Sequence, residues 1–143
     1  MSDPVNSNFS NIIREIIKKS LFTERQIEII LKSKNLSDEE FTITKGAYYR
    51  QVSQSREKLS ALYYSFIVLG ILGVVLPDDV DVISQLSERM SVIKDGDVFP
   101  EKEQEIIGVI ERVVGRLQIC DFVPRRLYFL ILCDNVLITL NVK

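Results

Sequence analysis

The sequence predicts a mainly α fold: a multi-helix domain with one long central helix and, at its C-terminus, a β-hairpin favoured slightly over a buried helix. Apolar residues recur three and four positions apart through most of the chain, which is the spacing of helices with one buried face. Residues that cap helices stand before several of these stretches. With 143 residues, 46% apolar and 27% charged, the chain is long enough to bury a core and has an ordinary globular composition.

The first two helices are predicted in the N-terminal quarter. The first carries an apolar stripe made of Phe9, Ile12, Ile13, Ile16 and Ile17. Thr23 opens the second, because Gln26 three positions later completes a capping box. We expect Ile27, Ile30 and Leu31 to face the core and this helix to end near residues 34–35. A short turn capped by Ser37 is expected next.

The long central helix is predicted to start after Thr44, which has the side chain of an N-cap. A heptad-like seam runs along it, formed by Tyr48, Val52, Ser55, Leu59, Leu62, Phe66 and Leu69. We expect Gly70, Gly73 and Pro77 to end the helix. The apolar part of the seam predicts the interface of a homodimer, made by Leu59, Leu62, Phe66 and Leu69.

Two more helices and a tail are expected beyond the central helix. The first begins at Asp78 or Asp79, and its inner face is predicted to be Val80, Ile83, Leu86 and Met90. The second is predicted to bury Ile106, Val109, Ile110, Val113, Val114 and Leu117. In the tail, polar and apolar residues alternate, which favours a strand pair turning at residues 134–135. We therefore divide the chain into a helix-turn-helix-like half (residues 1–75) and a packing or dimerisation half (residues 76–143).

Charge and composition narrow the function classes. Residues 1–75 hold ten Lys/Arg against eight Asp/Glu, whereas residues 76–143 hold eight against twelve, so a polyanion should approach the first half. The chain has no histidine and two cysteines, Cys120 and Cys133, which are expected to be reduced in a cytoplasmic protein. No phosphate loop or identifiable catalytic base is present, so we expect no enzyme activity, no metal and no cofactor.

The segment from Phe22 to Leu59 resembles the helix-turn-helix of sigma-factor region four and LuxR-type regulators. The residues Phe22-Thr23-Glu24-Arg25-Gln26 match the start of that motif, and Leu36-Ser37 match the start of its second helix. The recognition helix is matched by Thr44-Lys45-Gly46-Ala47-Tyr48 and, at its basic end, by Arg56-Glu57-Lys58-Leu59. Relative to the family pattern, roughly five residues are missing before Thr44. The resemblance implies a DNA-binding transcriptional regulator.

The side chains of the central helix support the same function independently of the resemblance. Arg and Lys neutralise phosphates, Gln and Arg read base edges, and Ser or Tyr donate to phosphate oxygens. A helix N-terminus also offers free N–H groups to an anion. The predicted DNA-binding residues are Thr44, Lys45, Tyr49, Arg50, Gln54, Arg56 and Lys58. A dimer built on the adjacent seam is the usual way for such helices to gain enough contacts.

Two alternatives remain open at the level of sequence. The cationic side chains can be the solvated face of a helix in a protein-protein interaction or assembly factor that does not bind nucleic acid, and the acidic C-terminal half can dock a protein partner. Residues 59–76 contain no charge and have the length of a short membrane span, but Ser60, Tyr63, Tyr64 and Ser65 favour a buried helix or a dimer interface. The predicted partners are therefore double-stranded DNA and a second copy, with no membrane.

Overall fold

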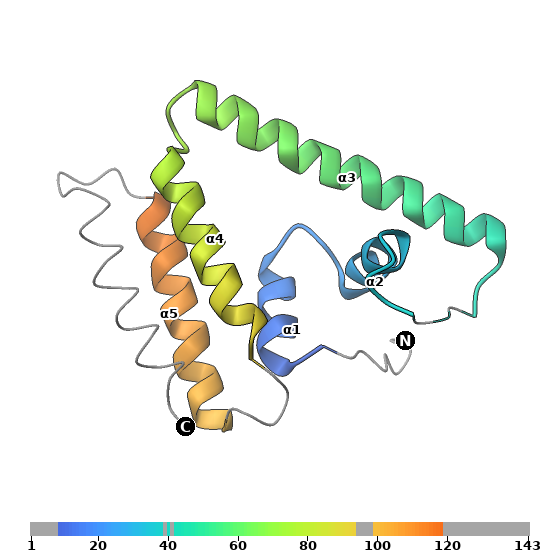
Figure 1. Ribbon diagram of the computed structural model, residues 1–143, viewed down its shortest axis with the longest axis horizontal. Coiled ribbons are helices and arrows are strands. Elements are labelled where there is room, and N and C mark those ends of the chain that lie inside the picture. The colour runs from blue at the N-terminus through green and yellow to red at the C-terminus, as the bar shows by residue number, and fades with distance from the viewer. Residues whose placement is uncertain (1–8, 39, 41, 94–98, 119–143) are drawn as a thin grey trace.

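The fold is mainly α-helical, as the sequence predicts, in a computed structural model that describes residues 9–38, 40, 42–93 and 99–118 (Figure 1). The helices are α1 (Asn11–Lys19), α2 (Glu24–Ser33), α3 (Lys45–Ile71), α4 (Pro77–Ser91) and α5 (Pro100–Gln118). The long central helix is α3, with 27 residues. The predicted C-terminal hairpin and both cysteines lie outside the described residues.

Local sequence signals set where the helices begin. Ser10, Thr23 and Thr44 are the N-caps of α1, α2 and α3, and the side chain of each accepts a hydrogen bond from a backbone N–H in the first turn. The predicted capping box is confirmed: Gln26 N–H donates to Thr23 Oγ1 at 3.2 Å, and Thr23 N–H donates to Gln26 Oε1 at 3.0 Å. Pro77 is the first residue of α4, where its missing N–H costs no hydrogen bond.

Left-handed residues end α2 and α3. Asn35 has φ 55° and Gly73 has φ 74°. Leu36 N–H donates to Leu31 O at 2.8 Å, and Val74 N–H donates to Leu69 O at 2.9 Å. These are the six-to-one bonds of Schellman motifs, which satisfy the last carbonyls of a helix. The predicted end of α2 near residue 35 and the role of Gly73 are both confirmed.

The helices form two groups joined by α3 (Figure 1). Helices α4 and α5 lie side by side, and α1 packs against α5. Helix α2 packs against the N-terminal half of α3. In Figure 1, α2 is seen nearly end-on whereas α3 runs across the view, so the two helices cross. The contact between α1 and α5 joins the predicted first half to the second, and the division at residue 75 stays a prediction. No helix in the described part of the chain has the length and apolarity needed to cross a bilayer.

The core between α4 and α5 corrects one predicted helix face. Val82, Val109 and Val113 form a buried cluster against which Leu86 and Leu117 pack. The predicted inner residues Val80 and Ile83 are exposed instead. Val82 and Leu86 are four apart and so share a face, and α4 turns this face to α5. Two overlapping apolar patterns in α4 made the sequence ambiguous, and packing against α5 selected one of them.

Helix α2 and the segment after it also differ from the sequence prediction. Ile29 is only 1% exposed, while the predicted core residues Ile27, Ile30 and Leu31 are half-buried. Several faces of α2 are thus partly covered, so its periodicity alone does not reveal the deepest residue. The residues between Lys34 and Thr44 that the structure describes are not helical, so they do not support the predicted turn after Ser37.

Candidate nucleic-acid interface

The N-terminal half of α3 is supported from behind by α2. Val52 and Ser55 are the buried residues of α3, and Ile29 and Glu28 are those of α2. Val52 and Ser55 are three apart, so they define one face of α3. The small side chain of Ser55, at 2% exposure, leaves room for a neighbouring helix to come close. This face points inward, which leaves the opposite face of α3 to solvent.

Side chains at both ends of α2 fix how α3 is turned about its own axis. Lys58 Nζ donates to Gln26 Oε1 at 3.1 Å and lies 5.6 Å from the centre of the Phe22 ring. Ten positions earlier on α3, the Tyr48 ring lies 5.7 Å from Lys32 Nζ. Gln26 thus belongs both to the capping box of α2 and to the contact with α3. A rotation of α3 that buried its outer face would break both contacts.

The predicted DNA-binding residues fall into three groups on this helix. Lys45, Tyr49 and Arg56 form one exposed stripe, with Lys45 Nζ 5.9 Å from the centre of the Tyr49 ring. Arg50 and Gln54, four apart, form a second exposed stripe about 140° further round the helix. Lys58 is half-buried and faces the start of α2, so it lies apart from the other five.

Thr44 has a structural role at the start of this surface. Its Oγ1 accepts a hydrogen bond from Ala47 N–H at 3.2 Å, which caps α3 and satisfies one of the free N–H groups there. Lys45 and Gly46 follow it in the exposed first turn. Ser53 is exposed between the two stripes and was not among the predicted residues, although its position four residues after Tyr49 places it on this face.

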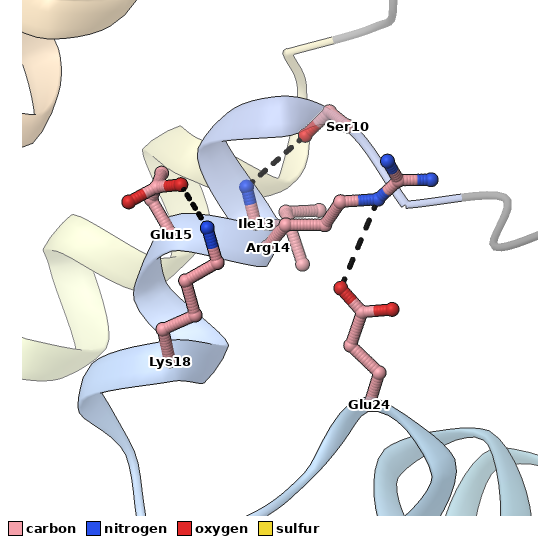
Figure 2. Close-up of polar contacts among 6 residues, drawn as sticks. All are labelled: Ser10, Ile13, Arg14, Glu15, Lys18 and Glu24. Carbon is pink, nitrogen blue, oxygen red and sulfur yellow. Dashed lines mark hydrogen bonds and ion pairs between the residues drawn. The ribbon is translucent and has the colours of Figure 1, made fainter. Parts of the chain in front are cut away.

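Five cations on α1, α2 and α5 take part in ion pairs, in contrast to those on α3. Lys18 pairs with Glu15 at 2.6 Å and Arg14 with Glu24 at 3.8 Å (Figure 2). The hydrogen bond and charge of Lys18 lower the pKa of Glu15. Further ion pairs join Lys19 to Glu111 at 2.8 Å, Arg25 to Glu28 at 3.6 Å and Lys102 to Glu105 at 2.9 Å.

A second ion pair raises the pKa of a lysine and also joins two helices. The hydrogen bond to Glu111 and the charge of that carboxylate raise the pKa of Lys19, which ties α1 to α5. Among the described residues, none of the ion pairs includes Lys45, Arg50, Arg56 or Lys58. The cations of α3 are therefore not neutralised by described carboxylates, and three of the four are exposed.

A shallow open hollow runs along the middle of α3. It is lined by α3 residues: Tyr49, Val52, Ser53, Arg56, Glu57, Ser60, Ala61 and Tyr64. Small side chains form its floor, and Tyr49 and Tyr64 border it. Glu57 is the acidic residue in it and stands beside Arg56, so it opposes an approaching anion at the end of the cationic stripe.

The described residues hold no group of three or more His, Cys, Asp or Glu side chains that could bind a metal ion. Comparison with protein-family models gives no match, and neither the curated proteins nor the solved structures include one similar to this chain. The geometry of α2 and α3 is therefore what bears on function.

Proposed function

We propose that this protein binds double-stranded DNA, with the N-terminal half of α3 as the recognition helix, and acts as a transcriptional regulator in the cytoplasm. One observation carries the proposal. Lys45, Arg50 and Arg56 are exposed on one helix and take part in none of the ion pairs between described residues, whereas Arg14, Lys18, Lys19, Arg25 and Lys102 on α1, α2 and α5 do. Unpaired cations on a supported helix are what phosphate binding requires.

The chemistry of the two stripes fits separate tasks in a DNA groove. Lys45 and Arg56 are placed to neutralise phosphates, and the Tyr49 hydroxyl is placed to donate to a phosphate oxygen. Arg50 and Gln54 share the outermost face, where long side chains reach base edges. Thr44 contributes by capping the helix end that faces the anion. Lys58 donates a hydrogen bond to Gln26, so it would contact a phosphate as a fourth cation only after breaking that bond.

The arrangement of α2 and α3 also supports this proposal. Helix α2 lies below the N-terminal half of α3 in Figure 1 and crosses it, as the first helix of a helix-turn-helix crosses its recognition helix. The connection between them, residues 34–44, is longer than the usual turn of about three to four residues. The crossing supports a helix-turn-helix-like arrangement of α2 and α3. The resemblance to sigma-factor region four and LuxR-type regulators places a helix start at Leu36-Ser37, and the described residues there are not helical, so this part of the chain departs from the resemblance.

A homodimer is part of this proposal, because one helix offers few base contacts and a second copy doubles them. The predicted interface residues Leu59, Leu62, Phe66 and Leu69 all lie in the C-terminal half of α3. Leu59, Leu62 and Leu69 are half-buried, and Phe66 is 37% exposed. This half of α3 lies beyond the cationic stripes, so a contact there leaves them free.

A titration of the protein against random-sequence duplex DNA at several salt concentrations tests the proposal. On random-sequence DNA Arg50 has no matching base to read and contacts a phosphate instead, together with Lys45 and Arg56. Three phosphate contacts per monomer predict a slope of log affinity against log salt of about −2.7, and a fourth from Lys58 makes it about −3.6. Undetectable binding at low salt, or binding that does not change with salt, would remove the DNA-binding function.

A second candidate function is a helical interaction or assembly factor without nucleic-acid activity. The observation that favours it is the exposed apolar surface on the C-terminal half of α3, which is larger than an isolated monomer normally leaves in water. The acidic residues of the C-terminal half would then serve a protein partner. The same titration separates the two, because this candidate predicts no binding to duplex DNA.

A further inference from the structure

The C-terminal half of α3 and the turn after it expose an unusual amount of apolar surface. Ile71 is 78% exposed and Tyr64 is 73% exposed. The exposed apolar band is defined here as Tyr63, Tyr64, Ile67, Val68, Ile71, Leu72 and Val74. Residues 59–76 contain no charged side chain that could shield it. Scattered exposed apolar residues are normal, but a contiguous band on one helix marks a contact surface.

This band is on a different side of α3 from the seam that the heptad pattern predicts. Leu59, Leu62 and Leu69 of that seam are half-buried, so the rest of the molecule already covers part of them. Tyr63, Ile67 and Ile71 are each four positions apart and form a row that faces solvent. In the part of the chain that the structure describes, the band is thus the more exposed apolar surface of α3, and the seam beside it is half-covered.

The exposed area of the band is close to what one partner contributes to a stable interface. Side chains of this size present about 150–250 Å² when fully exposed for aromatic residues, and somewhat less for aliphatic ones. With the observed exposed fractions, the band amounts to roughly 800 Å², which equals the share of one protein in a standard interface.

We propose that a second copy of this chain docks on the band. In a two-fold contact the patch meets a copy of itself, and residues close to the axis lie near their own equivalents, so a charge near the axis would meet a like charge. The band has none, and it is apolar throughout, which makes it complementary to itself. An acidic or basic partner would find no opposite charge here. The proposal rests on the homodimer part of the proposed function, places the contact on the band instead of the seam, and does not require DNA binding.

The placement of the band is compatible with the cationic stripes working at the same time. The last cation of the exposed stripes is Arg56, and the band starts at Tyr63, two helical turns further on. A second copy seated on the band leaves Lys45, Tyr49, Arg50 and Gln54 open to solvent. Dimerisation and phosphate binding can therefore be measured separately on the same full chain.

Sedimentation velocity of the full chain over about 1–100 µM tests the proposal, since this range brackets micromolar dissociation constants. The test variant is Ile67→Glu/Ile71→Glu, which places four carboxylates in the two-fold contact. The control is Val92→Glu/Val114→Glu, which adds the same charge at two exposed apolar residues, one just after α4 and one on α5. We expect a dimeric wild type and control, and a dissociation constant raised at least about 100-fold in the test variant.

Three results would overturn the proposal: a wild type that is monomeric over the whole range, a test variant that stays dimeric, or a control that dissociates equally. A monomeric wild type whose Ile67→Glu/Ile71→Glu variant melts early would show that the chain itself covers the band. Circular dichroism checks that the test variant keeps its helix content. Its binding to duplex DNA at low salt reports on the proposed function independently, because a monomer keeps the cationic stripes.

Discussion

The two halves of α3 belong to one continuous helix, but they have different surroundings. The N-terminal half has a buried face against α2, with Val52 and Ser55 inside and polar or cationic side chains outside. The C-terminal half has no fully buried residue, and its solvent-facing side is apolar. The first half is thus amphipathic in the usual sense, whereas the second presents its apolar side chains to water.

The periodicity of apolar residues along a helix therefore does not reveal which of its faces is covered. The same spacing of four and three runs from Tyr48 to Leu69, but α2 is only ten residues long and covers only the first part of it. Beyond α2, apolar residues lie on both sides of the seam, so their spacing no longer distinguishes the buried face from the exposed one. Variants in each half of α3 test this difference.

The largest expected effect is on DNA discrimination by the outermost face of the N-terminal half. Arg50→Ala/Gln54→Ala should lower the discrimination between binding sites by roughly 2–6 kcal/mol, because two base-edge contacts are lost. The same variant should unfold within about 0.5 kcal/mol of the wild type, because both residues are exposed. The measurement pairs a DNA titration with a thermal melt. A variant that melts early and binds normally would mean that Arg50 and Gln54 face inward.

A matched pair of valines compares the packing of the two halves directly. Val52 is 8% exposed and Val68 is 48% exposed on the same helix. Val52→Ala should lower the free energy of unfolding by about 2 kcal/mol, through lost burial and the cavity left behind. Val68→Ala should change it by no more than about 0.5 kcal/mol at concentrations where the protein is monomeric. Equal losses in urea unfolding would contradict the contrast between the halves.

Lys58 tests where the DNA-binding half ends. Lys58→Met keeps most of the apolar stem but removes the hydrogen bond to Gln26, which should cost about 1 kcal/mol of stability. The salt slope of DNA binding should stay the same, because this ammonium is held against α2. A slope that becomes shallower by about 0.9 would instead identify Lys58 as a phosphate contact.

Glu57 gives the smallest expected effect. It is exposed beside Arg56, and its carboxylate opposes the approach of phosphates. Glu57→Gln should strengthen duplex binding about two- to five-fold at low salt, and the gain should fade as salt screens the charge. Weaker binding in this variant would show that Glu57 orients a side chain of the cationic stripe.

The local parts of this architecture could be predicted from the sequence. Thr23, Gln26 and Thr44 act through neighbours three positions away, so the starts of α2 and α3 follow from their sequences. The ends of α2 and α3 follow likewise from Asn35 and Gly73. The exposed stripes were also predictable, because charged residues opposite an apolar seam face solvent.

Contacts between helices distant in sequence could not be predicted in the same way. Lys58 was predicted to bind DNA, yet it reaches Gln26, 32 positions away. The inner face of α4 was misplaced because its sequence allows two faces and only α5 selects between them. The seam stays a prediction, because nothing in a helical period shows which apolar side of α3 a second copy would use.

The proposed function depends on the binding of DNA phosphates by the exposed cations of the N-terminal half of α3. The most direct test compares the salt dependence of duplex binding in Lys45→Gln/Arg50→Gln/Arg56→Gln and in Lys18→Gln/Lys19→Gln/Lys102→Gln, which removes the same charge from cations already held in ion pairs. We predict that the slope of log affinity against log salt falls from about −2.7 to near zero in the first variant and stays close to the wild-type value in the second. Equal slopes in the two variants would contradict the claim, because net charge alone would then account for binding.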